Sequence, residues 1–205
     1  MSPPAVSLAV FDLGNVVYRC DPMATCRAWA RRSGADPADL ARRHPMNPRW
    51  EDFERGRLSG TEYWRYVNAA LGLSLTWEEF VEGWNAIYFE VFPEVAVALG
   101  QLRPRLPAVA LTNTNAVHCQ AWQPRYAPVL ALFQRVFISS EMGLRKPEPA
   151  IYRAVLQEMA APAAATLFFD DSAENVAAAR AVGLDAVLVG GPADVTRALR
   201  TRGLL

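Results

Sequence analysis

The sequence predicts an α/β protein, a parallel sheet covered by helices, with a small all-helical cap inserted after the first strand. Two observations predict it. After residue 93, short apolar runs alternate with helical segments, which is the pattern of a parallel sheet with helices on both faces. Between residues 21 and 89, helix-start signals recur and no run has the character of a strand. We therefore divide the chain into a core domain, residues 1–20 and 90–205, and a helical cap, residues 21–89.

Composition narrows the class of protein. The 205 residues are 52% hydrophobic and 20% charged, which suits one folded core plus a smaller unit. The 21 basic and 21 acidic residues give no net charge, so we expect neither a nucleic-acid partner nor an anionic membrane. Its three cysteines have no paired spacing, and no signal-peptide pattern or membrane-length apolar run occurs. We expect a cytoplasmic protein with free thiols.

The strands of the core are short apolar runs. The first covers residues 6–11 and ends at Asp12-Leu13-Gly14. The others are expected at residues 108–111, 136–138, 166–169 and 186–189, with helices at 94–102, 148–159 and 173–182. Right-handed crossovers bring the carboxyl ends of all these strands to one edge. The arrangement is a doubly wound, Rossmann-like parallel sheet.

The cap carries its own helix signals. Ser59 with Glu62, and Thr76 with Glu79, have the spacing of a capping box, and Gly34 and Gly72 are expected helix ends. Helix starts are also expected at Asp21-Pro22 and Asp36-Pro37. Ten aromatic residues fall between residues 50 and 89. We expect them to form the core of a small bundle rather than a stacking surface for a sugar or base.

Polar clusters follow four of the predicted core segments. They are Asp12, Thr112-Asn113, Lys146 and Asp170-Asp171. Adjacent Asp170 and Asp171 repel one another unless a cation compensates, and oxygen ligands with open positions suit Mg²⁺. A hydroxyl, an amide and an ammonium suit the oxygens of a phosphoryl group. Phosphoryl transfer needs mainly positioning and charge neutralisation, which this set of groups provides.

With these clusters in order, the chain resembles the haloacid dehalogenase-like hydrolase superfamily. The matching motifs are Phe11-Asp12-Leu13-Gly14-Asn15-Val16, Leu111-Thr112-Asn113, Gly143-Leu144-Arg145-Lys146-Pro147-Glu148-Pro149 and Phe168-Phe169-Asp170-Asp171-Ser172. The helical insertion corresponds to the family's small cap. The resemblance implies Mg²⁺ as the cofactor and a small phosphate ester as the substrate.

The resemblance also implies roles for individual residues. Asp12 would attack phosphorus through its carboxylate. The metal ligands would be Asp12, the Gly14 carbonyl, Asp170 (directly or through water) and Asp171. Thr112 and the backbone around Asn113 would bind the phosphoryl oxygens. Lys146 would neutralise Asp12 and the phosphate, and neighbouring Arg145 is a weaker candidate.

Position 14 departs from the family pattern. Most phosphatases of the superfamily carry there an Asp that protonates the leaving oxygen, and Gly14 has no side chain. Groups of the cap that could replace it are Asp21, His44, Glu51 and Glu54. The alternative is a better leaving group, such as the anomeric hydroxyl of a sugar 1-phosphate. The patterns Phe53-Glu54-Arg55-Gly56 and Thr112-Asn113-Thr114-Asn115 are similar to the branch containing α-D-glucose-1-phosphate phosphatases, which favours a sugar phosphate.

Other functions remain open at the level of sequence. A 2-haloacid dehalogenase also uses an aspartate nucleophile, but it needs no metal, and Leu13-Gly14-Asn15 does not match its usual pattern. A non-catalytic interaction protein could retain the fold. A phosphotransferase such as a mutase is a further alternative, which the missing acid disfavours.

Overall fold

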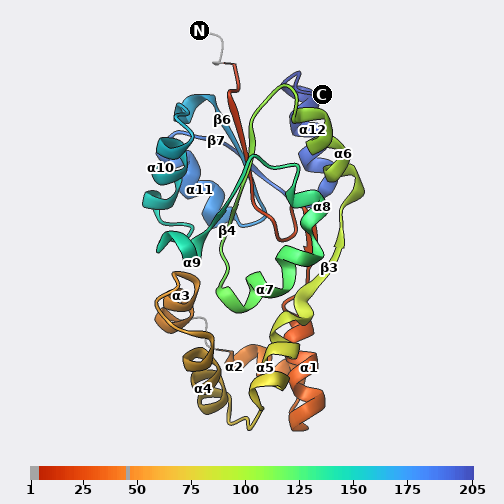
Figure 1. Cartoon of the computed structure of the whole chain (residues 1–205), viewed down its shortest axis with the longest axis vertical. Helices are drawn as coiled ribbons and strands as arrows, with labels where there is room; N and C mark the ends of the chain where they lie inside the picture. Colours follow the sequence, from red (N-terminus) through yellow and green to blue (C-terminus); the bar gives the residue numbers. More distant parts are fainter. Residues whose placement is uncertain (1–4, 45–46) are drawn as a thin grey trace.

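The computed structural model describes residues 5–44 and 47–205, and it consists of two lobes (Figure 1). The larger lobe is built on a five-stranded parallel sheet in the order β5-β4-β1-β6-β7. The strands are β1 (Leu8–Phe11), β4 (Ala108–Thr112), β5 (Arg135–Ile138), β6 (Thr166–Asp170) and β7 (Asp185–Leu188). The predicted fold class, a doubly wound parallel sheet with a helical insertion, is confirmed.

The central position of β1 sets up the polar edge. β1 pairs with β4 on one side and β6 on the other, and Phe11 is in register with both Ala110 and Phe169. Because all three strands run in the same direction, their carboxyl ends meet at one edge. Asp12, just past β1, therefore lies between the ends of β4 and β6.

Alternation along the buried strands divides the apolar core into two layers. Ala9 and Phe11 face the layer formed with α6 (Pro93–Leu102), α7 (Ala116–Arg125) and α12 (Pro192–Thr201). Leu8 and Val10 face α10 (Pro149–Glu158) and α11 (Ala173–Val182). Figure 1 shows these two groups of helices on opposite sides of the sheet. The short helices α8 (Ala127–Leu130) and α9 (Ser139–Met142) complete the lobe, with the 3-10 turn η2 (Ala163–Ala165) before β6.

The smaller lobe, here called the helical unit, contains five helices within the described residues. They are α1 (Met23–Ser33), α2 (Pro37–Arg43), α3 (Pro48–Glu54), α4 (Gly60–Leu71) and α5 (Trp77–Trp84). Both predicted capping boxes form, at Ser59 and Thr76. Gly34 and Gly72 end α1 and α4 in the left-handed conformation, as expected. Within the described residues, no helix is both long and apolar enough to cross a membrane.

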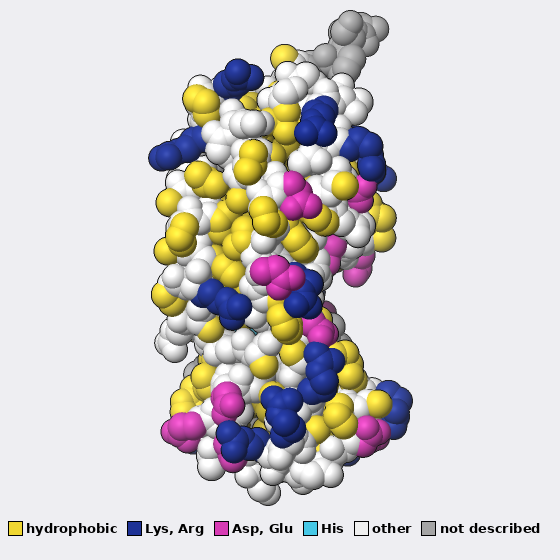
Figure 2. Space-filling view, turned by 90° about the vertical axis from the view of Figure 1, so that its right-hand side faces the viewer, with side chains coloured by type: hydrophobic (Ala, Val, Ile, Leu, Met, Phe, Trp, Pro, Cys, Tyr) yellow, Lys and Arg dark blue, Asp and Glu magenta, His cyan; other side chains and the backbone are white. Residues whose placement is uncertain are grey.

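The junction between the lobes contains two strands that the sequence did not predict. β2 (Tyr18–Cys20) and β3 (Tyr88–Val91) pair antiparallel, so the chain leaves and re-enters the core along the same path. The 3-10 turn η1 (Asn85–Ile87) precedes β3. Figure 2 shows the molecule narrowing between the lobes.

The aromatic residues of the helical unit form its core, as predicted. Phe53, Tyr63, Phe80 and Trp84 are buried in one cluster together with Trp29. The cluster reaches α7, where the ring of His118 stacks on Trp84 with centroids 4.8 Å apart. Nδ1 of His118 lies 2.9 Å from Oδ1 of Asn85.

We expect this buried histidine to make the fold sensitive to acid. Burial lowers the pKa of His118 from 6.5 to about 3. As the pH falls below 6.5, His118 therefore becomes protonated in the unfolded chain but stays neutral in the folded chain. The resulting stabilisation is complete above that pH and decreases by about 2 kcal/mol by about pH 5.

Urea unfolding at about pH 7.5 and about pH 5 measures this loss, with His118→Gln as the comparison. The wild type should lose about 2 kcal/mol more than the variant. Equal losses in the two proteins would contradict the assignment.

Candidate active site

The centre of the polar edge is a buried ammonium group. Lys146 is 1% exposed, and its Nζ donates to Oδ1 of Asp12 at 2.8 Å and to Oδ2 of Asp170 at 2.6 Å. Such a charge is stable away from water only when it is paired and hydrogen-bonded. Residues from three separate segments thus meet around one cation, as the sequence predicted from their shared position at strand ends.

Asn113, at the end of β4, holds the loop that carries Lys146. Its Nδ2 donates to the carbonyl oxygen of Lys146, and its Oδ1 accepts from the Lys146 backbone N–H, both at 2.8 Å. The side chain of Asn113 is therefore engaged, which leaves its backbone for the predicted phosphoryl contact. Thr112 is buried beside it and lines the same cavity.

The paired acids occupy different environments. Asp170 is fully buried, and its Oδ1 accepts from the Ser172 backbone N–H and from Nδ2 of Asn175, both at 2.9 Å. Asp171 is exposed and accepts from Nδ2 of Asn15 at 3.1 Å. One carboxylate oxygen from each of Asp12, Asp170 and Asp171 can be chosen so that all lie within 4.8 Å of one another.

Asn15 and Asn175 are site residues whose roles the sequence analysis did not assign. Asn15 adopts a φ of 55°, which asparagine tolerates better than most residues, and its Oδ1 accepts from the Cys20 backbone N–H at 2.9 Å. The position of Asn15 in the turn that follows Asp12 was the sequence signal that could have indicated its role. At Gly14, an added Cβ would meet Sγ of Cys20 at 3.4 Å, an ordinary contact.

Charge at this edge is unbalanced. Burial raises the pKa of Asp12 to about 7; the ammonium of Lys146 opposes this rise and the nearby Asp170 adds to it. Burial by itself would lower the pKa of Lys146, but the attraction of Asp12 and Asp170 raises it. Three carboxylates thus lie near one ammonium, which contacts two of them. An all-oxygen donor set with surplus negative charge fits a hard divalent cation such as Mg²⁺.

A cavity of about 230 Å³ opens onto these groups. Its walls include Asp12, Gly14, Thr112 and Lys146 from the core, and Glu54 from α3. The carboxylate of Glu54 accepts from Nε of Arg145 at 2.8 Å.

Of the four predicted proton carriers, Glu54 alone lines this cavity within the described residues. Asp21 pairs with Arg27, and Glu51 pairs with Arg55. His44 lies beside a neighbouring cavity. The weaker candidate Arg145 is held by Glu54 and is absent from the described lining.

The family model of the haloacid dehalogenase-like hydrolases matches residues 6–183, which include all four polar clusters. The chain belongs to this family. It is similar to a D-ribitol-5-phosphate phosphatase of Bacteroides thetaiotaomicron, with 26% identity over 86% of this chain and 88% of that protein. It is also similar to a sesquiterpene phosphatase of Aspergillus oryzae, with 27% identity over 86% of each chain.

A solved structure has the same fold. It is a family enzyme from B. thetaiotaomicron in complex with magnesium and inorganic phosphate, with a TM-score of 0.78 and 20% identity. The match covers 90% of this chain and 94% of that one. The match to the family model agrees with the resemblance in the sequence motifs.

Removing the ammonium should destabilise the metal-free protein. We expect Lys146→Met to lower the free energy of unfolding by about 3–5 kcal/mol, because it leaves two buried carboxylates uncompensated. The double variant Lys146→Met/Asp170→Asn should recover part of this loss. Urea unfolding measures both, and a Lys146→Met protein as stable as the wild type would contradict the argument.

Proposed function

We propose that the protein is a Mg²⁺-dependent phosphatase that hydrolyses a small phosphate monoester through an aspartyl-phosphate intermediate on Asp12. The observation that carries the proposal is the contact of one buried ammonium with Asp12 and Asp170, at a cavity that Lys146 and Asp12 line. The phosphatase names of two relatives and the magnesium and phosphate bound by a structural neighbour support it.

Asp12 is suited to nucleophilic attack. Lys146 holds its Oδ1, which leaves Oδ2 to form the bond to phosphorus while the ester P–O bond breaks and the alcohol takes up a proton. Water then attacks the phosphoryl group on Asp12, releasing inorganic phosphate and regenerating the carboxylate. The Thr112 hydroxyl, the Asn113 backbone N–H and the Lys146 ammonium would bind the phosphoryl oxygens.

For the metal we propose Asp12, Asp171 and the Gly14 carbonyl as direct ligands. Both oxygens of Asp170 already have protein donors, whereas Asp171 is exposed and accepts one hydrogen bond. Asp170 then serves mainly to hold Lys146. The bound ion would supply charge neutralisation at the phosphoryl oxygens.

Glu54 is our candidate for the proton carrier. It lines the Asp12 cavity, and burial raises the pKa of its carboxyl while Arg145 opposes that rise. A carboxyl of raised pKa can protonate an alkoxide and later accept a proton from water. The alternative suggested by the sequence, a sugar 1-phosphate with a better leaving group, would depend less on such a residue.

We expect purified protein to release phosphate from a panel of monoesters only when Mg²⁺ is present. Asp12→Asn removes the nucleophile and should abolish this release. Colorimetric phosphate assays with and without a chelator measure the dependence. Halide release from 2-haloacids in the presence of chelator would instead support a dehalogenase, and an inactive wild type would favour a non-catalytic role.

Glu54→Gln should lower kcat/KM for alkyl phosphates by about a hundred- to ten-thousand-fold, because kcat/KM reports the steps up to release of the alcohol and not the later attack of water. It should affect p-nitrophenyl phosphate far less, because that leaving group needs no proton. Since position 14 has room for a Cβ, Gly14→Asp added to Glu54→Gln should restore part of the lost rate. Equal losses on both esters would show that Glu54 does not protonate the leaving group.

A further inference from the structure

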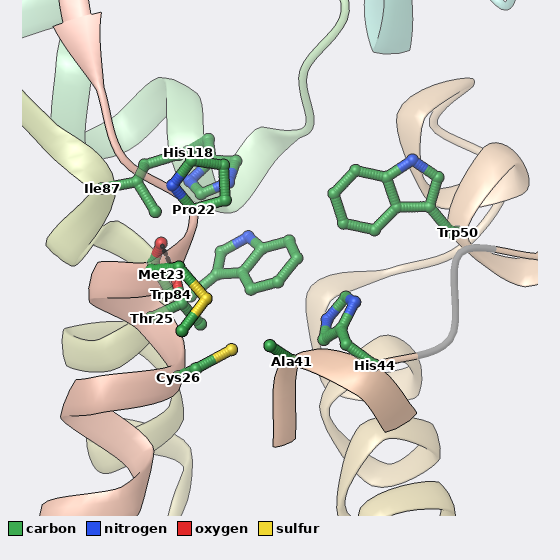
Figure 3. Close-up of a pocket in the computed structure, with 10 residues that line it drawn as sticks. All are labelled: Pro22, Met23, Thr25, Cys26, Ala41, His44, Trp50, Trp84, Ile87 and His118. Carbon is green, nitrogen blue, oxygen red and sulfur yellow. Dashed lines mark hydrogen bonds between the residues drawn. The ribbon is translucent and has the colours of Figure 1, made fainter. Parts of the chain in front are cut away.

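A second cavity, of about 200 Å³, adjoins the catalytic one. It lies between α1, α2, α3, α5, η1 and α7, and Figure 3 shows the α1 residues facing Ala41, His44 and Trp50 across it. Pro22, Trp50, Ile87 and His118 line both cavities. The space beside Asp12 therefore continues into the helical unit.

The walls of this second cavity are mostly apolar and carry no charged side chain within the described residues. Its described lining residues include no Asp, Glu, Lys or Arg. The hydroxyl of Thr25 donates to the Trp84 carbonyl at 3.4 Å, and His118 is hydrogen-bonded to Asn85. Nε2 of His44 is buried without a hydrogen-bond partner among the described residues. Burial lowers the pKa of His44 to about 4 and that of His118 to about 3, so both rings are neutral near pH 7.

Such walls discriminate between kinds of alcohol. A polyol placed here would exchange hydrogen bonds with water for contacts with Pro22, Ala41 and Ile87, whose side chains have no polar atom to replace them. A hydrocarbon group would gain by leaving water and by packing against the indole rings. An apolar cavity of roughly 150 Å³ binds benzene, so this one is large enough for a group of about that size.

We propose that the substrate is the phosphate monoester of an apolar alcohol, whose hydrocarbon part occupies this cavity while its phosphoryl group lies against Asp12. The inference rests on the proposed phosphatase function and names the substrate class of that site. It differs from the sugar phosphate suggested by the sequence, because the second cavity has no carboxylate or cation among its described lining residues to bind sugar hydroxyls.

The first experiment compares two small esters of primary alcohols, 3-methylbutyl phosphate and glycerol 3-phosphate, in the Mg²⁺-loaded protein. Each methylene group that enters an apolar pocket raises kcat/KM by about tenfold or more. We therefore expect kcat/KM to be at least about tenfold higher for the 3-methylbutyl ester. Glucose 1-phosphate and ribitol 5-phosphate extend the polar side of the comparison.

Variants then test whether this cavity causes the preference. Met23 lines it and is 36% exposed, so Met23→Gln should fold while making the wall polar. Ala41→Phe should fill the space instead. Each should reduce the preference for the 3-methylbutyl ester by about tenfold. Val97→Gln, at a residue of α6 that is 60% exposed, is the matched control and should keep the wild-type preference.

Binding separates the two proposals. Calorimetry with 3-methylbutylphosphonate, which cannot be hydrolysed, should show tighter binding to the wild type than to Met23→Gln. Faster hydrolysis of the polyol or sugar esters, or an unchanged preference in both cavity variants, would overturn the apolar substrate and leave the phosphatase standing. If Met23→Gln weakened binding of the phosphonate but the wild type hydrolysed no ester, the proposed phosphatase function would be wrong. The proposed substrate class would then be wrong as well.

Discussion

The structure of the polar edge depends on one constraint: a lysine ammonium is buried among carboxylates. Removing such an ion from water costs several kcal/mol, so its partners must be held in good geometry around it. Asp12 and Asp170 are fixed because β1 and β6 are neighbouring strands that end at the same level. The side chain of Asn113 positions Lys146 by hydrogen bonds to the Lys146 backbone. The Asn175 side chain and the Ser172 backbone N–H orient Asp170. The order of the strands, the hydrogen bonds of Asn113 and the start of α11 thus all position groups around the ammonium of Lys146.

The helical unit is attached to this same region. The Ser139 hydroxyl at the end of β5 donates to the Glu54 carbonyl at 2.7 Å, and the carboxylate of Glu54 accepts from Arg145, next to Lys146. Gly56 approaches so closely that a Cβ would lie 2.2 Å from the Ser140 carbonyl oxygen. The end of α3 is therefore held against the loop that carries Lys146. These contacts fix the position of the helical unit relative to the charged groups.

Much of this could be predicted because the signals are local. Asp12 and Asp170 follow uninterrupted apolar runs, and the capping boxes at Ser59 and Thr76 need only a few neighbouring residues. Other features depend on tertiary contacts. β2 and β3 are only three and four residues long, and each contains a charged residue, so they are hard to recognise before they pair. The helices α3 and α12 were not predicted either. The apolar cavity is assembled from six separate elements, so no window of sequence reveals it.

The arrangement of α3 joins the two halves of the proposed chemistry. Trp50 and Glu54 are four residues apart, which places them on one face of the helix. Trp50 contributes to both cavities, and Glu54 contributes to the one that contains Asp12. An alcohol held against Trp50 would then have its oxygen near the carboxyl of Glu54. The proton carrier missing at Gly14 and the surface that selects the alcohol would come from the same helix, so the cap would supply acid catalysis and specificity together while the core supplies the charges that bind phosphate.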